Sequence, residues 1–452
     1  MKTKICSVVL SVCLLFGCLG ALSSCDKGGN ADLVNAEINE NGELVLTFGD
    51  GTEKNLGVVV GKDGKDGADG ANGENGQNGA SGGDGYIHIT TDESAISLAT
   101  AKGLRSAVSI VANFEATVQQ GGWYPGYGST TTEEYSFKGS GVIYRMDKNT
   151  GDAFVITNYH VVYDESSNSE SGISEDIEVY LYGSEIEEKT IKATYVGGSM
   201  YYDIAVLHIE NSDILKDSDA CATDISDSDT VSVGDSAIAI GNAKGYGISA
   251  SLGIVSVDSE HLTMLAVDGK TAVSFRVMRV DTAINSGNSG GGLYDENGTL
   301  IGIVNAKIID DGVENIGYAI PSNVAVAITE NIIDHCYGKD ETSVQRAMLG
   351  LTVTSSDSRA LYDPQSGKIT LKETVSVYEV AADSLASGVL QKEDVLVSIT
   401  LDGKTTQITR QHQIIERMLD ARVGDTVTIA LIRGGTNMTI DITITQDSVA
   451  SY

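Results

Sequence analysis

The stretch Gly287-Asn288-Ser289-Gly290-Gly291-Gly292 decides the fold of this chain of 452 residues. Glycines on both sides of Ser289 permit a tight turn in which neighbouring backbone amides point at one spot. Upstream, His160 follows an apolar run at residues 153–157, and Asp203 opens a second apolar run at residues 204–209. The chain therefore carries a histidine, an aspartate and a serine in that order, each beside a predicted strand or turn.

These three residue types suit nucleophilic catalysis. A neighbouring imidazole makes a serine hydroxyl nucleophilic by taking its proton, and a buried carboxylate holds that imidazole in the useful tautomer. We therefore expect Ser289 to be the nucleophile, His160 the base and Asp203 the partner of the base. The backbone amides of Gly287 and Ser289, together with Asn288, are the candidates for an oxyanion hole.

Each signal has a simpler explanation when it is taken alone, since Gly-rich stretches form hairpin turns and strand-end histidines are commonly structural. Their combination favours the catalytic interpretation. His208 also lies close to Asp203 in the sequence, but in mid-strand and without a matching serine loop. Surface positions are predicted for the remaining histidines, His88, His261, His335 and His412. No His/Cys cluster has zinc spacing and no acidic loop matches an EF-hand, so no metal or organic cofactor is expected.

Further motifs surround these residues in a fixed order, and they are Gly139-Ser140-Gly141-Val142-Ile143, Ile240-Gly241-Asn242, Gly253-Ile254-Val255-Ser256, Asp281-Thr282-Ala283-Ile284-Asn285 and Gly317-Tyr318-Ala319-Ile320-Pro321. The chain order His, Asp, Ser is typical of chymotrypsin-type proteases. Over about residues 100–335 the chain resembles the HtrA/Deg family of trypsin-fold serine proteases. The resemblance implies two six-stranded β-barrels with the triad His160, Asp203 and Ser289 between them. It also implies homotrimers that cleave unfolded polypeptides in extracytoplasmic quality control.

A few positions depart from the family pattern. Gly292 stands where the family usually has proline, and Ser286 stands where proline or arginine is common. Ala243-Lys244-Gly245 replaces the usual Pro-Phe-Gly. All of them lie in loops around the predicted site, and every catalytic group is retained. Ala283 stands where a trypsin-type preference for basic residues would require aspartate. That residue fits the small aliphatic preference that the resemblance implies.

The strand pattern predicts a mainly β chain. Between residues 104 and 325, short apolar runs alternate with Gly- and Asp-rich turns, which favours a barrel or sandwich over a βαβ fold. Helical periodicity at residues 324–335 closes this part, so we expect the protease domain at residues 86–340.

The C-terminal part, residues 346–450, resembles a single small α+β PDZ domain with an amphipathic helix around residues 410–419. On this resemblance, Leu349, Gly350 and Leu351 form the loop that receives the carboxylate of a C-terminal peptide, while the peptide adds a strand to the sheet.

Residues 1–24 have the pattern of a bacterial lipoprotein signal peptide: a short basic region, an apolar run, and Cys25 at the first mature position. Cys25 is therefore the expected site of lipidation, which would anchor an extracytoplasmic protein to the membrane. An uncut membrane anchor is the alternative. Asp26 would favour inner-membrane retention in a host with two membranes, but the sequence leaves the type of host open.

Two features occupy residues 25–85. A β-hairpin is predicted from residues 43–48 and 56–60 around a turn at residues 49–51. Glycine then stands at every third position from 61 to 85. Only glycine fits the axis of a collagen triple helix, so a triple-helical stalk is one interpretation. A flexible stalk spanning roughly 25–30 Å is the other.

The net charge and the number of cysteines limit the possible partners and disulfides. The chain has 63 acidic and 30 basic residues, and its formal charge of −33 repels nucleic acid and anionic lipid. Besides Cys25, the mature chain would keep only Cys221 and Cys336, whose pairing stays open. The sequence thus predicts a lipid-anchored serine endopeptidase regulated by peptides. Two alternatives remain, a chaperone or stress sensor with a silent site and a surface adhesin built on the collagen-like run.

Overall fold

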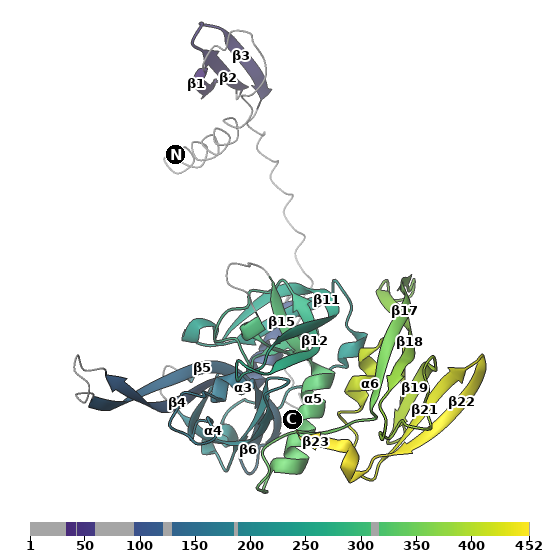
Figure 1. The fold of residues 1–452 in the computed structure, drawn as a ribbon. Helices are drawn as coiled ribbons and strands as arrows, with labels where there is room; N and C mark the ends of the chain where they lie inside the picture. Colours follow the sequence, from purple (N-terminus) through teal and green to yellow (C-terminus); the bar gives the residue numbers. More distant parts are fainter. Residues whose placement is uncertain are drawn as a thin grey trace, which may run out of the picture. The chain divides into compact units, whose positions relative to one another are not determined.

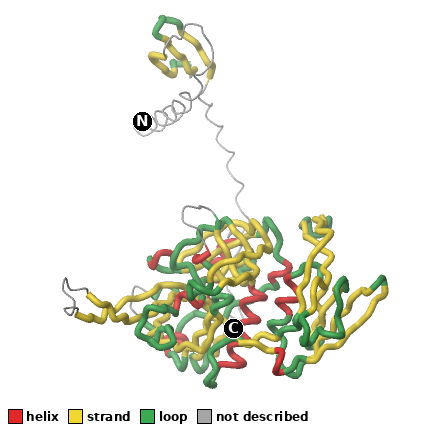
Figure 2. Tube along the Cα trace, in the orientation of Figure 1, coloured by secondary structure: helices red, strands yellow, loops and turns green. Residues whose placement is uncertain are grey.

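The computed structural model describes residues 33–41, 43–58, 95–120, 129–184, 189–308 and 316–451. The predicted signal peptide at residues 1–24, the lipidation site Cys25 and the Gly-x-y run at 61–85 lie outside these ranges. Strands dominate and helices are few, which confirms the prediction of a mainly β protein (Figure 2). Among the helices described, none combines the length and apolar character needed to cross a bilayer.

A small antiparallel sheet forms the N-terminal unit, with strands β1 (Leu33–Ile38), β2 (Glu43–Phe48) and β3 (Glu53–Val58) in that order. Strands β2 and β3 are the expected hairpin, although β3 begins earlier, at Glu53. Asp50 sets the turn, because its Oδ1 accepts hydrogen bonds from the backbone and hydroxyl of Thr52 at 2.9 and 2.7 Å. Strand β1 is an addition to the predicted hairpin.

The first barrel closes six strands on one another. In spatial order they are β4 (Ala107–Gln120), β5 (Ser129–Asp147), β6 (Asp152–Thr157), β9 (Ile204–Ile209), β8 (Ile191–Ser199) and β7 (Asp176–Leu181). Alternate residues of β4 point inward, so Val108, Ile110 and Ala112 are fully buried. Strands β4 and β5 continue beyond the barrel as a long hairpin arm (Figure 1).

The second barrel repeats this architecture with β10 (Ser236–Gly241), β11 (Ser249–Leu265), β12 (Ala272–Val280), β15 (Gly317–Pro321), β14 (Leu300–Val304) and β13 (Gly292–Tyr294). Its core includes Ile238, Val277 and the fully buried Tyr294. Barrels of six strands have an interior that side chains fill, so neither barrel is a channel. The double-barrel architecture that the resemblance implies is confirmed.

Two helices brace the barrels. Helix α2 (Ala95–Ser106) lies on the second barrel, where a Cβ at Gly103 would be 2.5 Å from Ile240 Cδ1. Helix α5 (Ser322–Cys336) is the predicted C-terminal helix of this region. It packs back on the first barrel so closely that a Cβ at Gly197 would be 2.9 Å from Cys336 Sγ. The shorter helical segments are α3 (Tyr159–Val162), α4 (Asp213–Asp217), η1 (Ser228–Thr230), η2 (Ala243–Gly245), η3 (Ala306–Ile308) and η4 (Gln446–Ser448).

A separate sheet forms the C-terminal unit at residues 345–451. Its strands run in the order β17 (Leu351–Tyr362), β18 (Ile369–Val380), β19 (Val395–Leu401), β21 (Thr426–Arg433) and β22 (Thr436–Thr443), and β20 (Lys404–Gln407) pairs with β19. A two-stranded sheet of β16 (Gln345–Ala347) and β23 (Val449–Ser451) closes the unit. Val375, Ile399 and Ile429 are fully buried beneath the single helix.

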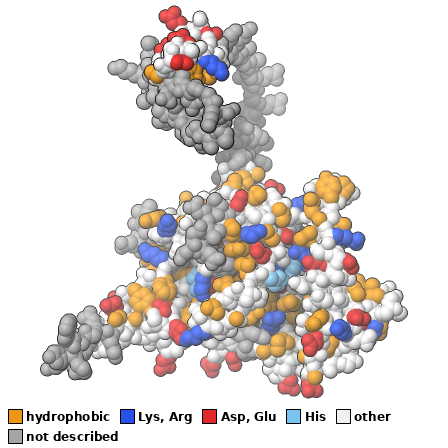
Figure 3. Space-filling view, turned by 45° about the horizontal axis from the view of Figure 1, so that its top comes forward, with side chains coloured by type: hydrophobic (Ala, Val, Ile, Leu, Met, Phe, Trp, Pro, Cys, Tyr) orange, Lys and Arg blue, Asp and Glu red, His pale blue; other side chains and the backbone are white. Residues whose placement is uncertain are grey.

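That helix, α6 (His412–Arg417), is shorter than the expected span of residues 410–419. At its start, Gln413 Oε1 accepts the backbone N–H groups of Thr409 and Arg410 at 2.7 and 3.0 Å. After Met418 the backbone hydrogen bonds tighten to i→i+3, as in Leu419 N–H to Glu416 at 3.0 Å, and the α-helix ends. On the face drawn in Figure 3, basic side chains stand among acidic and polar ones.

Candidate active site

The three predicted catalytic residues come from both barrels. His160 lies in α3, directly after strand β6 of the first barrel. Asp203 immediately precedes β9 of the same barrel, which pairs with β6. Ser289 lies in the loop that leads into β13 of the second barrel. Side chains 43 or more positions apart in the sequence are therefore carried by strand ends that the two barrels bring together.

His160 and Asp203 are joined by two contacts. The ring Nδ1 of His160 lies 2.6 Å from Asp203 Oδ2, and the backbone N–H of His160 donates to Oδ1 at 2.9 Å. Asp203 is buried and has a positive φ of 54°, a conformation that turns its carboxylate back toward α3. Because a carboxylate accepts, Nδ1 carries the ring proton and Nε2 remains an acceptor for a serine proton.

Two asparagines complete the surroundings of Asp203. Asn305, which follows β14, donates from Nδ2 to Asp203 Oδ2 at 2.8 Å, and Asn158 donates to the backbone carbonyl of Asp203 at 2.8 Å. Both asparagines are fully buried. Neither was among the predicted site residues. The available signal was a polar amide directly after an apolar strand, where burial requires a partner for the amide.

Gly290 allows Ser289 to lie close to the end of β6, the strand that precedes His160. A Cβ at Gly290 would lie 2.2 Å from the carbonyl oxygen of Ser140 and 2.3 Å from Thr157 Oγ1, so only glycine permits this approach. The hydroxyl of Ser289 accepts the backbone N–H of Ala306 at 3.3 Å. Within the described part of the chain, no hydrogen bond joins Ser289 to His160 in this resting arrangement.

The loop before Ser289 carries the candidate oxyanion-hole amides. The N–H of Asn288 donates to the carbonyl of Asn285 at 3.0 Å, so this amide is already engaged. The amides of Gly287 and Ser289 have no acceptor among the residues that the structure describes. Ser140 fixes the loop from below, since its hydroxyl donates to the Gly287 carbonyl and accepts the Asn242 N–H, both at 2.7 Å.

A second candidate site lies in the C-terminal unit. The predicted carboxylate loop, Leu349, Gly350 and Leu351, lines a pocket of about 140 Å³ whose opposite wall is Ile414, Ile415 and Met418. Gly350 has φ 73°, and its carbonyl accepts the N–H of Ala381 at 2.8 Å. The structure thus brings the loop and the apolar face of α6 together around one opening.

Where the structure describes them, the remaining histidines and cysteines, and the acidic residues that could bind a metal, lie outside the site around Asp203. His208 lies in β9 with its ring against Phe154 and Tyr337, away from the Asp203 carboxylate contacts. The surface position expected for His412 is wrong, because α6 packs on the second barrel and leaves that side chain buried. Of the cysteines in the described ranges, Cys221 and Cys336 are both free. One group with metal-ligand atoms close together exists there, Asp229, His412 and Glu416, but the guanidinium of Arg276 lies among them.

Comparisons with known proteins find similarity to trypsin-like serine proteases. The profile of the trypsin-like peptidase domain matches residues 139–303, which include His160, Asp203 and Ser289. The chain is 30% identical over 379 residues to the serine protease Do-like HtrA of Lactococcus lactis subsp. cremoris, covering 80% of this chain and 84% of that protein. It is 31% identical to the Do-like HtrA of Bacillus subtilis, covering 78% and 74%. It is also 31% identical to the periplasmic serine endoprotease DegP of Escherichia coli, covering 72% and 60%.

Proposed function

This chain belongs to the HtrA family of trypsin-like serine proteases, and from that premise we propose that Ser289, His160 and Asp203 are its catalytic residues. The protein is a serine endopeptidase. The observation that carries the residue assignment is the His160–Asp203 pair, with Nδ1 and Oδ2 at 2.6 Å, beside the glycine-flanked Ser289.

In the proposed mechanism, Ser289 Oγ leaves the Ala306 amide, turns toward His160 and attacks the carbonyl carbon of the scissile peptide. Its proton passes to His160 Nε2, and Asp203 stabilises the imidazolium through Nδ1–H. The amides of Gly287 and Ser289 donate to the oxyanion. His160 then gives its proton to the leaving amine as the C–N bond breaks. A water molecule attacks the acyl-enzyme, its proton goes to His160, and Ser289 regains a proton as the acid departs.

The substrates are unfolded or misfolded polypeptides, and the kinship with the HtrA proteases supports this proposal. Ala283 stands where a basic specificity would need a carboxylate, which supports a preference for small aliphatic residues before the scissile bond.

The C-terminal unit is a PDZ domain at residues 346–450 that binds C-terminal peptides and regulates the protease domain at residues 86–340. The pocket between Leu349, Gly350 and Leu351 and the apolar face of α6 supports this proposal. Amides of the loop would receive the peptide carboxylate, and the pocket would take the last side chain.

The protein acts outside the cytoplasm as a lipid-anchored homotrimer. Cys25 carries the lipid after removal of residues 1–24, and the Gly-x-y run at 61–85 spaces the enzyme from the membrane. The lipoprotein-type N-terminus supports the lipid anchor. The relative DegP is named a periplasmic endoprotease, which supports a place outside the cytoplasm.

Labelling with a fluorophosphonate probe, followed by casein cleavage, tests the assignment. Wild-type protein should be labelled at Ser289 and should cleave casein, whereas Ser289→Ala should do neither and His160→Ala should be severely impaired. Casein cleavage that survives in Ser289→Ala would place the nucleophile elsewhere. A wild-type protein that stays unlabelled, even with unfolded polypeptide present, would favour a binding role as chaperone or sensor.

A further inference from the structure

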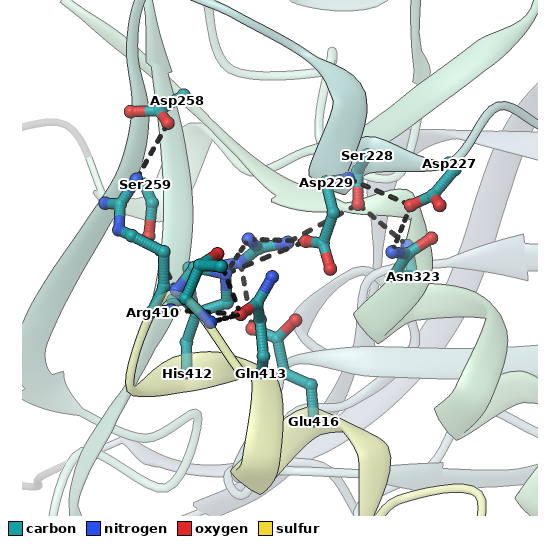
Figure 4. A network of polar contacts seen from close by, with 12 residues as sticks. Asp227, Ser228, Asp229, Asp258, Ser259, Asn323, Arg410, His412, Gln413 and Glu416 are labelled. Atoms are coloured by element: carbon teal, nitrogen blue, oxygen red, sulfur yellow. Dashed lines mark hydrogen bonds and ion pairs between the residues drawn. The ribbon is translucent and has the colours of Figure 1, made fainter. Parts of the chain in front are cut away.

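A partly buried charge cluster joins the second barrel to the C-terminal unit. Its centre is Arg276 of β12, whose side chain is 3% exposed. Arg276 Nη1 donates to Asp229 Oδ1 of η1 at 2.9 Å and lies 2.6 Å from His412 Nε2. Arg276 Nε lies 2.8 Å from Glu416 Oε1. Figure 4 shows His412 and Glu416 directed from α6 toward Asp229. One guanidinium from the barrel therefore contacts two side chains of the opposing helix.

This cluster is not suited to a metal ion. Ligand atoms of Asp229, His412 and Glu416 lie within 4.8 Å of one another, which is the spacing a cation would use. The guanidinium of Arg276, however, is within hydrogen-bonding distance of all three residues. A permanent organic cation thus occupies the position that a metal would need, because arginine keeps its charge in proteins.

The number of charges in the cluster does not balance if both carboxylates are ionised. One guanidinium would then face two carboxylates, of which Asp229 is partly exposed (side chain 24%) and Glu416 is largely buried (side chain 12%). An uncompensated buried charge is costly, and this cost falls mainly on Glu416. Arg276 Nε and Glu416 Oε1 are close, yet neither makes a well-directed hydrogen bond with any described residue. Glu416 therefore has the Coulomb attraction of Arg276 but, among the described residues, lacks a directed hydrogen bond to its Oε1, whereas Asp229 has the directed bond from Nη1.

Proton affinities in the cluster follow this geometry. Burial raises the pKa of Glu416 to about 8, against the opposing influence of Arg276. Burial raises the pKa of Asp229 too, but His412 and Arg276 outweigh it and hold that pKa at about 2. Burial lowers the pKa of His412 to about 4, so its ring is neutral near pH 7. Near neutral pH the cluster therefore contains one cation and one anion.

We propose that Arg276, Asp229, His412 and Glu416 form a proton-dependent latch, which holds the C-terminal unit on the second barrel most firmly while Glu416 is protonated and His412 is neutral.

Charged groups around the latch are paired with one another. Arg410 donates to Asp258 Oδ2 of β11 at 3.0 Å and lies 3.9 Å from Glu373 of β18, and Arg279 lies 3.6 Å from Glu260. Ser259 Oγ lies 3.4 Å from His412 Nδ1, and the ring of His261 is the other titratable group on this part of β11. Of these pairs, Arg410–Asp258 joins the C-terminal unit to β11, whereas Arg410–Glu373 lies within the C-terminal unit and Arg279–Glu260 lies within the second barrel.

The direction of the pH effect follows from proton counting. Between about pH 6.5 and 8, docked Glu416 keeps a proton that an exposed glutamate has lost, so docking takes up a proton and weakens as pH rises. Between about pH 4.5 and 6.5, the proton on docked Glu416 balances the proton that an exposed histidine would carry, and docking hardly changes. One proton corresponds to a change in the docking equilibrium of up to about tenfold per pH unit.

The latch acts on the helix that forms one wall of the C-terminal pocket. His412 and Glu416 are one turn apart and contact the barrel, while Ile414, Ile415 and Met418 line the pocket. When the C-terminal unit undocks, the helix that forms this wall of the pocket loses its contacts with the second barrel.

Hydrogen exchange of the full chain from pH 6 to 9 tests the latch, with Ser289→Ala in every sample to prevent self-cleavage. After correction for intrinsic rates, peptides covering Ser228–Thr230 and His412–Arg417 should lose protection as pH rises, by up to about tenfold per unit. Glu416→Gln, a neutral mimic of the protonated acid, should keep its protection across this range.

The matched control is Glu379→Gln, which changes an exposed glutamate of the same unit and should follow the wild-type profile. The same loss of protection in Glu416→Gln as in the wild type would overturn the proposal, and so would wild-type protection that does not vary with pH. Circular dichroism of each variant verifies that the fold is retained. The readout is independent of proteolysis, so its result stands apart from the catalytic assignment.

Discussion

Asn305 Nδ2 donates to Oδ2 of Asp203 at 2.8 Å, and the same carboxylate oxygen lies 2.6 Å from His160 Nδ1. The other oxygen, Oδ1, accepts the His160 backbone N–H. Asn305 belongs to the second barrel, whereas Asp203 and His160 belong to the first. The amide of Asn305 thus ties the orientation of the carboxylate in one barrel to the position of the other barrel.

Removing that amide should impair catalysis. Hydrogen bonds to charged groups contribute about 1.5–3 kcal/mol, so Asn305→Ala should lower kcat/KM by about 10- to 100-fold. Peptide hydrolysis measured from pH 5 to 9 decides this. A kcat/KM for Asn305→Ala within twofold of wild type would contradict the positioning role.

Gly290 should not tolerate a side chain. In Gly290→Ala, the new Cβ would approach Ser140 O to 2.2 Å at a φ of 82°, so the serine loop must move. We expect a fall in kcat/KM of at least about 100-fold, since small misplacements of reacting groups have effects of that size. Gly388→Ala is the matched control, because Gly388 has φ 78° with no described atom within 4 Å of a Cβ.

The control variant should lose only about 1–2 kcal/mol of stability, because alanine is strained by that amount at positive φ. Its cleavage of peptides should remain at the wild-type level. Equal activities of the two variants would show that crowding at Gly290 does not position Ser289.

Asp394 should make the C-terminal unit sensitive to acid. Arg433 donates to both carboxylate oxygens, at 2.7 and 2.6 Å, and Asp394 is buried. Burial raises the pKa of Asp394, but Arg433 and the Gln391 amide outweigh burial and lower that pKa from its ordinary value. A lowered carboxyl pKa contributes stability above the unfolded pKa that is lost as pH falls through the folded pKa.

Hydrogen exchange of β19 and β21 should therefore show weaker protection as pH falls below about 4. Asp394→Asn should weaken the unit by about 1–3 kcal/mol at pH 7 and should flatten the acid response. Asp402→Asn, at an exposed turn that asparagine also tolerates, is the control and should behave as wild type. An unchanged acid response in Asp394→Asn would refute the assignment.

The pocket beside α6 should bind peptides through an apolar last residue and a free carboxylate. Ile415 is 38% exposed and lines this pocket, so Ile415→Glu should weaken binding at least about tenfold without harming the core. Val397→Glu changes a residue of similar exposure, 36%, outside the pocket and should have little effect.

Fluorescence anisotropy with a labelled peptide ending in an apolar residue measures this binding. The same peptide with an amidated C-terminus should bind poorly, because the loop amides at Leu349, Gly350 and Leu351 would lose a charged acceptor. Equal affinity of the acid and amide forms would argue against a carboxylate loop.

Local patterns in the sequence predicted a mainly β barrel or sandwich and the candidate residues His160, Asp203 and Ser289. The two barrels were implied by the resemblance that the motifs around these residues carry. Glycines in a fixed spacing mark turns, and apolar alternation marks strands, so both signals are carried by neighbouring residues. The same reasoning located helix α5 and the β2–β3 hairpin. It overestimated α6, because the hydrogen bonds after Met418 that end this helix leave no mark in the periodicity.

Only the tertiary structure decided which polar groups meet. Asn305 contacts Asp203 across 102 positions, and Arg276 meets His412 across 136, which placed a histidine expected at the surface inside an interface. The resting bond of Ser289 to Ala306 and the engaged amide of Asn288 are likewise products of packing. Strand and turn propensities act over a few residues, whereas these contacts depend on how the two barrels and the C-terminal unit pack against one another. The sequence therefore determined the parts and their order, and long-range packing determined the partners of each buried polar group.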